Sequence, residues 1–160
     1  MTRSRPIVLT ATAAAVALAA LAVAVFGSSA ATAAPDATNA RSATIKVAHS
    51  SLGKIIVDSR GRTLYMLSAD SPNKSHCSGA CAQAWPPLRA TRKPTVGTGL
   101  KASKVGTIRR SDGKPQVTYN HHPLYRFVQD AKAGQTNGEG ITAFGGLWTV
   151  LSPVGRSVSP

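Results

Sequence analysis

Short apolar runs alternate with turn residues along the chain from Ala43 onward. The runs contain β-branched and other apolar side chains, and Gly, Pro, Asn or Asp separates one run from the next. The predicted strands are residues 44–48, 54–58, 63–67, 106–110, 116–120, 124–128 and 147–152. This pattern predicts a mainly β protein in which neighbouring strands are antiparallel.

The connections between these runs are short. Tight turns are predicted at residues 59–61, 111–113 and 120–122. Asp112-Gly113 is the strongest signal, because a type I′ hairpin turn needs positive φ at both central residues. One short helix is expected near residues 78–84, where Ser78 can serve as N-cap and the prolines at 86 and 87 prevent continuation.

The chain resembles itself when it is shifted by 60 residues. The matches are Gly53-Lys54 with Gly113-Lys114, Val57 with Val117, Leu64-Tyr65 with Leu124-Tyr125, and Asp70 with Asp130. Each half then reaches a tryptophan, Trp85 or Trp148. We therefore expect two sequence-related antiparallel β-hairpin repeats, about 53–88 and 113–150, packed as one pseudo-symmetric domain over residues 43–155.

Both repeats carry a tyrosine followed five residues later by an aspartate. The second copy runs from Tyr125 through Phe127 to Asp130, and the first runs from Tyr65 to Asp70 with Leu67 in the place of the aromatic residue. The chain resembles the exported family called the secreted repeat of unknown function, whose members carry a Tyr-x-aromatic-x-x-Asp signature in each repeat. The resemblance extends over residues 46–155 and implies export without implying a particular activity.

The N-terminal segment has the pattern of an export signal. Arg3 and Arg5 precede an uncharged apolar run over 7–26, and small residues follow it. Cleavage after Ala33 gives a signal peptide over 1–33 and leaves a polar, flexible tether over 34–42. The apolar run is also long enough to span a bilayer, so an uncleaved anchor is the alternative. We expect a secreted or extracytoplasmic protein associated with the cell envelope.

The chain is strongly basic, with 19 Lys and Arg against 6 Asp and Glu in 160 residues. Removal of residues 1–33 takes away two arginines and no acid, which leaves 17 basic and 6 acidic residues, a net charge of +11. Such a charge attracts anionic cell-wall polymer or an anionic membrane surface. The basic residues are scattered, with no run beyond pairs, so no specific nucleic-acid partner is expected.

The repeated tyrosines and aspartates are the first candidates for a site. Residues five apart on a continuous strand face opposite sides, so Tyr65 and Asp70 share a face only if the chain turns between them. We expect the tyrosine rings to pack in the core and the aspartates to accept backbone N–H groups at the strand ends. A ligand-binding role for the pairs is the alternative.

The two cysteines, Cys77 and Cys81, are predicted to form a disulfide, because nearby thiols pair outside the reducing cytoplasm. The alternative is a copper site built from soft ligands. Its candidate residues beside the cysteines are His76, His121, His122 and Met66. We expect no cofactor and no catalytic residue, since no G-x-S-x-G motif or free nucleophilic cysteine is indicated. The expected function is a non-enzymatic binding or structural module, and the alternative is an extracytoplasmic copper-handling or redox protein.

Overall fold

The structure is a computed structural model that describes residues 44–158. The expected signal peptide, 1–33, and the expected tether, 34–42, lie outside the described residues. Between residues 44 and 158, no helix has the length and apolar character needed to cross a membrane.

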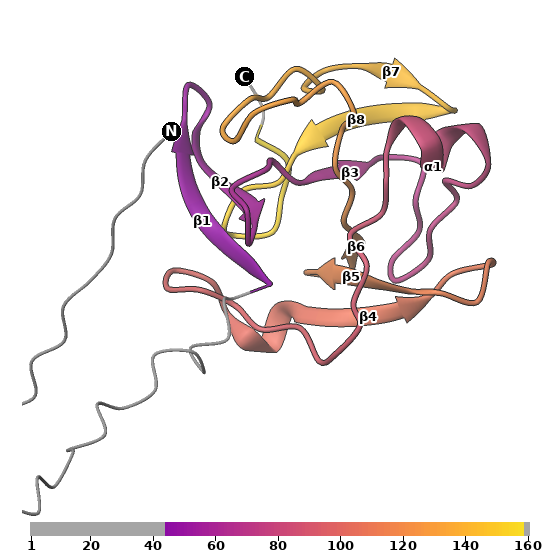
Figure 1. The fold of residues 1–160 in the computed structure, drawn as a ribbon, viewed down its shortest axis with the longest axis horizontal. Coiled ribbons are helices and arrows are strands. Elements are labelled where there is room, and N and C mark those ends of the chain that lie inside the picture. The colour runs from indigo at the N-terminus through magenta and orange to yellow at the C-terminus, as the bar shows by residue number, and fades with distance from the viewer. Residues whose placement is uncertain (1–43, 159–160) are drawn as a thin grey trace, which may run out of the picture. The chain divides into compact units, whose positions relative to one another are not determined.

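The described residues form short antiparallel strands, as the short apolar runs separated by turn residues predict (Figure 1). The elements are β1 (Ile45–Ser50), β2 (Gly53–Asp58), β3 (Tyr65–Leu67), α1 (Ala80–Ala84), the 3-10 helix η2 (Ala102–Lys104), β4 (Val105–Arg109), β5 (Pro115–Tyr119), β6 (His122–Pro123), β7 (Thr142–Ala143) and β8 (Gly146–Val150). They make a β1-β2 hairpin and two three-stranded sheets, β3-β8-β7 and β4-β5-β6. The mainly β prediction is therefore confirmed.

The two repeats are interlocked through an exchange of strands. β3 of the first repeat pairs with β8 at the end of the second, while Tyr125 of the second repeat bridges to Pro87 at the end of the first. At the centre Tyr65 donates its backbone N–H to Tyr125 at 2.9 Å, and Tyr125 donates to Tyr65 at 3.0 Å. These reciprocal bonds relate the repeats by an approximate two-fold axis.

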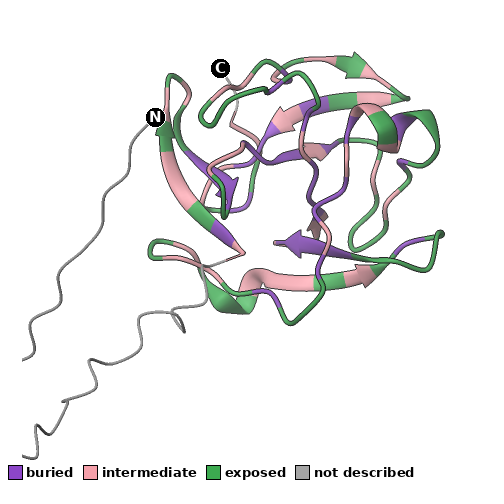
Figure 2. Ribbon diagram, viewed as in Figure 1, coloured by how far each residue is buried: buried purple, intermediate pink, exposed green. Residues whose placement is uncertain are grey.

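The offset between the repeats is not 60 residues throughout. The N–H of Leu64 bonds to the carbonyl of Ile56, and the N–H of Leu124 bonds to that of Val117, both at 3.0 Å. Ile56 is therefore the counterpart of Val117, and the match of Val57 with Val117 is wrong by one residue. The first-repeat turn is one residue longer, so the offset is 61 before it and 60 after it. Consistent with this, the last four residues of both β2 and β5 are buried (Figure 2).

A stack of aromatic rings fills the core at this axis. The rings of Trp85 and Trp148 are parallel, with centroids 3.9 Å apart. Tyr65 meets Trp85 edge-on at 5.3 Å, and Tyr125 meets Trp148 edge-on at 5.1 Å, so each repeat contributes the same pair. Phe127 stacks on the other face of Trp85 at 4.1 Å. Offset and edge-on contacts of this kind stabilise a core beyond the area they bury.

The predicted geometry of one turn is wrong. Only Gly113 of the pair Asp112-Gly113 has positive φ, and the loop closes through a bond between Arg110 and Lys114, as in a three-residue hairpin with a bulge. The type I′ geometry occurs instead at Asn120 and His121, where φ is 49° and 71°.

Two element boundaries also differ from the predictions. The helix starts at Ala80 after Gly79, whose φ is 54°, and no side chain caps it, so Ser78 is not the N-cap. Residues 124–128 form no regular strand. Only Tyr125 makes bridges, to Tyr65 and to Pro87, because the neighbouring segment contains Pro86-Pro87 and these prolines have no N–H to donate.

Candidate functional site

The repeated Tyr and Asp residues form two hydrogen bonds across the interlocked repeats. The hydroxyl of Tyr65 donates to Asp130 Oδ2 at 2.6 Å, and the hydroxyl of Tyr125 donates to Asp70 Oδ2 at 2.7 Å. Each tyrosine thus pairs with the aspartate of the other repeat, because the chain exchange brings the ends of the two motifs together. Within its own repeat neither tyrosine contacts its aspartate through a hydrogen bond among residues 44–158.

The second oxygen of each aspartate holds the loop that follows the motif. Asp70 Oδ1 accepts the N–H of His76 at 2.7 Å, and Asp130 Oδ1 accepts the N–H of Asn137 at 2.9 Å. Acceptance of backbone N–H groups is the role that the sequence predicts for the aspartates. Both carboxylates are thereby committed to structural hydrogen bonds.

Burial fixes the protonation state of the tyrosines. Burial, and then the neighbouring carboxylate, raises the pKa of Tyr65 and of Tyr125 well above the usual value for a phenol. Burial also raises the pKa of Asp70 and Asp130, while their hydrogen bonds act in the opposite direction. Both phenols therefore remain protonated hydrogen-bond donors at neutral pH.

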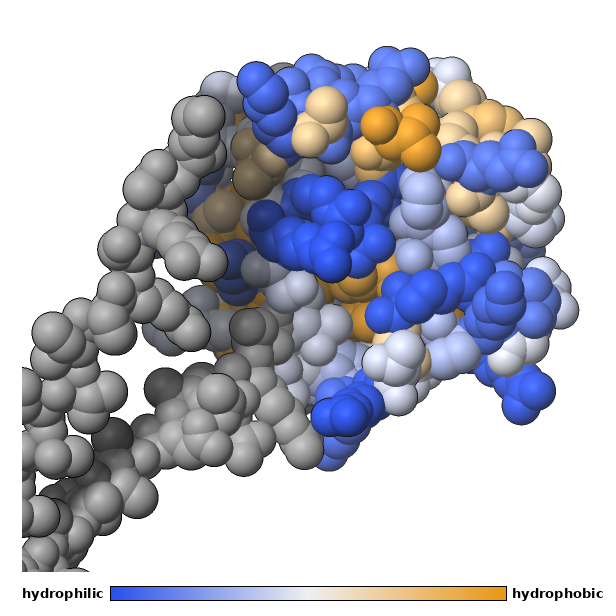
Figure 3. Space-filling view, in the orientation of Figure 1, coloured by the Kyte–Doolittle hydropathy of each residue, from blue (hydrophilic) through white to orange (hydrophobic). Residues whose placement is uncertain are grey.

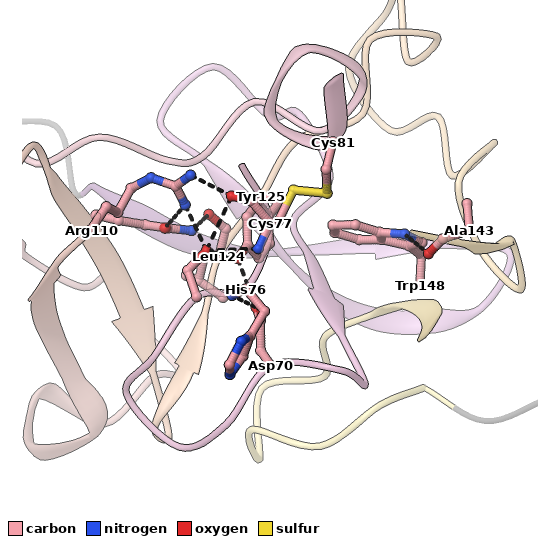
Figure 4. The surroundings of a disulfide bond; sticks show 11 residues. Asp70, His76, Cys77, Cys81, Arg110, Leu124, Tyr125, Ala143 and Trp148 are labelled. Atoms are coloured by element: carbon pink, nitrogen blue, oxygen red, sulfur yellow. Dashed lines mark hydrogen bonds between the residues drawn. A yellow bond between two sulfur atoms is a disulfide. The ribbon is translucent and has the colours of Figure 1, made fainter. Parts of the chain in front are cut away.

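The predicted disulfide between Cys77 and Cys81 is confirmed, and it packs in the same core cluster as Tyr125 and Trp148 (Figure 4). Arg110, whose side chain is 2% exposed, stabilises the loop that carries the disulfide. Arg110 donates to the carbonyl of Cys77 and to Ser75 Oγ, and the Ser75 hydroxyl is 2.7 Å from that of Tyr125. The bridge and the motif therefore form one connected structure.

The alternative copper ligands do not converge. His76 Nε2 is 3.2 Å from Ser71 Oγ, and His121 Nδ1 is 3.0 Å from Asn73 Nδ2. His122 is half-buried, and burial followed by the charge of His121 lowers its pKa. Met66 packs against an apolar cluster, and both cysteine sulfurs are in the disulfide. Among residues 44–158, no three His, Cys, Asp or Glu side chains are grouped so as to hold a metal ion.

Four basic residues that are scattered in the sequence lie around one pocket in the structure. A cavity of about 320 Å³ has four basic residues in its lining, Arg89, Arg92, Lys93 and Arg126. We call these four residues the basic pocket. The cluster of residues 89, 92 and 93 is visible in the sequence, but Arg126 joins it only through the interlocking of the repeats, since its N–H bonds to the carbonyl of Pro86 at 2.9 Å.

The comparisons with known proteins agree with the duplicated architecture. A family model described as a secreted repeat of unknown function matches the chain twice, over residues 46–89 and 106–152. The chain belongs to this family. No curated protein and no solved structure matches the chain. The two matched segments each contain one copy of the Tyr/Asp motif, which supports the repeat assignment and adds no activity.

Proposed function

We propose that this secreted-repeat protein is a non-enzymatic binding module that attaches to anionic polymer of the cell envelope. The observation that carries the proposal is the distribution of charge. Residues 44–158 contain 16 Lys and Arg against 5 Asp and Glu, and 11 of the 16 basic residues are exposed. Strongly hydrophilic residues cover much of the face drawn in Figure 3.

Most acidic side chains of residues 44–158 are bound by other groups of the protein. Asp70 and Asp130 bind the tyrosines, and Glu139 accepts the N–H of Val150. We call these three residues the interior carboxyls; burial raises the pKa of each. Asp58 is 1% exposed and is bound by two arginines, so only Asp112, at 40%, is an exposed acid among the described residues. The exposed charged side chains of residues 44–158 are therefore basic, with Asp112 as the single exposed acid.

The state of the repeated motif supports a role without catalysis. Its phenols are protonated and donate to carboxylates, and those carboxylates already bind backbone N–H groups. A general acid or base must exchange a proton with a bound substrate within hydrogen-bond reach. Groups committed to internal hydrogen bonds are poorly suited to that task.

Co-sedimentation with isolated cell wall tests the proposal. Attraction between a cationic surface and an anionic polymer weakens as the Debye length falls, from about 10 Å at 0.1 M salt to about 3 Å at 1 M. The protein should sediment with the wall at low salt and be released as salt rises. An unrelated protein of equal net charge is the control. Absence of binding at low salt would contradict the proposed function.

A further inference from the structure

We propose that the basic pocket is a binding site for phosphate groups, and that it recognises the phosphodiesters of an anionic wall polymer. This inference rests on the proposed function and gives it a site and a ligand chemistry. The pocket combines four basic side chains from two separate segments of the chain, 89–93 and 126, around one cavity of about 320 Å³. That volume lies at the lower end of the range for small-ligand sites.

Asp58 holds one side of the pocket in place. Its carboxylate accepts from Arg126 Nε at 2.8 Å and from Arg62 Nε at 3.0 Å, and its other oxygen accepts the N–H groups of Arg60 and Arg62. Arg126 uses only Nε in this contact. Its two terminal nitrogens have no acceptor among the described residues and remain available to a ligand.

The opposite side of the pocket supplies charges without internal partners. Arg92 and Lys93 are exposed, and neither forms an ion pair with any residue in 44–158. Arg89 binds Asp112 at 2.9 Å, which neutralises part of its charge. The unpaired positive charge of the pocket therefore comes from Arg92 and Lys93, and Arg126 adds the two terminal nitrogens that its ion pair with Asp58 leaves free.

Two threonines that line the cavity add neutral donors. The N–H of Thr44 bonds to Thr95 Oγ1 at 3.2 Å, and the N–H of Thr95 bonds to Thr44 Oγ1 at 3.1 Å. Each hydroxyl oxygen is thus an acceptor and keeps its own hydrogen free to donate. These reciprocal bonds also fix the segment that carries Arg92 and Lys93 against the start of β1.

The pseudo-symmetry provides an internal comparison for this pocket. The counterpart of Arg126 is Met66, 60 residues earlier, which packs against an apolar cluster. Leu88 and Leu151 make equivalent bonds to Leu124 and Leu64, so the counterpart of Arg89 is Ser152. The equivalent place in the fold thus has Met66 and Ser152 at these two positions, and neither is basic. The fold does not require these charges, and solubility does not require them to share a cavity.

The donor set fits a phosphate better than a lone carboxylate. Guanidinium groups present paired N–H donors that match two oxygens of a phosphate, and ammonium and hydroxyl groups can bind the remaining oxygens. A carboxylate has two oxygens and would leave donors of the pocket unused. A polyanion can place one phosphate in the pocket while its neighbours contact the surrounding basic surface.

An NMR titration at fixed ionic strength tests the pocket, with inorganic phosphate and acetate as probes. The double variant Arg92→Gln/Lys93→Gln removes two charges from the pocket, and Lys74→Gln/Lys132→Gln removes two exposed lysine charges elsewhere. Loss of charged hydrogen-bond donors should weaken phosphate binding about tenfold in the pocket variant. The control variant should bind as the unchanged protein does, and acetate should bind more weakly than phosphate.

Wall co-sedimentation with the same variants separates this inference from the proposed function. The pocket variant should lose more wall binding than the control, and removal of the phosphate polymer from the wall should abolish the difference. Equal losses in the two variants would overturn the pocket and leave general charge attraction intact. Phosphate binding without wall binding would retain the pocket and refute the proposed function. Pocket-dependent binding to phosphatidylglycerol vesicles alone would overturn the assignment to wall polymer.

Discussion

The hydrogen bond between Tyr65 and Asp130 offers the sharpest test of how the repeats are held together. The hydroxyl of Tyr65 donates to Asp130 at 2.6 Å and accepts the N–H of Gly138 at 3.2 Å. Tyr65 is 0% exposed and Asp130 is 6% exposed, so water cannot easily replace the lost group. Tyr65→Phe removes this hydroxyl and keeps the ring that packs on Trp85.

The expected loss can be compared across three tyrosines. A hydrogen bond to a charged group contributes about 1.5–3 kcal/mol, and a stranded buried N–H adds to the loss. Tyr65→Phe should therefore reduce the free energy of unfolding by about 3 kcal/mol. Tyr125→Phe should reduce it by about 2 kcal/mol, since Asp70 is only half-buried. Tyr119 bonds to the neutral N–H of Lys101 and carbonyl of Pro153, so Tyr119→Phe should remove only about 1 kcal/mol.

Urea unfolding at pH 7, followed by circular dichroism, measures all three changes. The difference between the unchanged protein and Tyr65→Phe should narrow as the pH falls through the raised native pKa of Asp130, because the carboxyl then becomes neutral. The hydrogen bond it accepts is then an ordinary neutral one. If Tyr65→Phe is no more destabilising than Tyr119→Phe, the charged partner does not stabilise the interlocked repeats and the reasoning is refuted.

Other substitutions are expected to raise or to lower the free energy of unfolding. Phe144→Asn should raise the free energy of unfolding by about 1 kcal/mol, because Phe144 has φ 54° in a tight turn and Asn tolerates that geometry better; an unchanged urea midpoint would argue against strain there. Gly138→Ala should lower it by about 3 kcal/mol or more, since the new Cβ would lie 2.6 Å from Trp85 Cη2, and Tm in a thermal melt would detect this. Cys77→Ser should lower it by about 2 kcal/mol and preserve the β circular-dichroism spectrum, since the closed ring is short; loss of that spectrum would show a larger role. The interior carboxyls have native pKa values above their unfolded ones, so they favour the native state increasingly as the pH falls from 7 toward about 4. The native pKa of His122 is lowered below 6.5 and opposes this gain, so His122→Gln should steepen the rise in urea midpoint between pH 6.5 and 4.5, and a flatter profile would contradict the sign.

Strand positions follow well from the sequence where a strand pairs with a regular neighbour. The strand expected at 54–58 is β2, Gly53–Asp58, and the strand expected at 116–120 is β5, Pro115–Tyr119. A short run bounded by turn residues is a local property, so the sequence predicts it. The strand expected at 124–128 does not form a ladder, because its partner contains Pro86-Pro87. That partner is known only when the exchange between the repeats is known.

The pairing of each tyrosine with an aspartate could be predicted from the sequence only in part. Residues five apart face opposite sides of a strand, so the spacing already argues against a contact between Tyr65 and Asp70 along a continuous strand. Identifying Asp130 as the partner requires the exchange that places β3 beside β8. The disulfide was predictable because only three residues separate Cys77 from Cys81 and the chain carries an export pattern.

The basic pocket was not predictable, because its members are far apart in the chain. Arg92 and Lys93 are adjacent, but Arg126 is 34 residues from Arg92. Its orientation depends on Asp58, which a sequence pattern does not distinguish from any other turn aspartate. Charge clusters made by long-range contacts require the fold itself.

The contacts that hold the two repeats together involve other residues than those proposed to bind a ligand. The central contacts occur twice in the same form: Tyr65 and Tyr125 exchange backbone hydrogen bonds, and each donates its hydroxyl to the aspartate of the other repeat. Since every such contact joins the two repeats, one repeat alone would leave buried donors and acceptors without partners. The shared motif is therefore expected to act in folding. Recognition is expected where the two repeats differ, and the substitution of Arg126 for the apolar Met66 at equivalent positions is such a place.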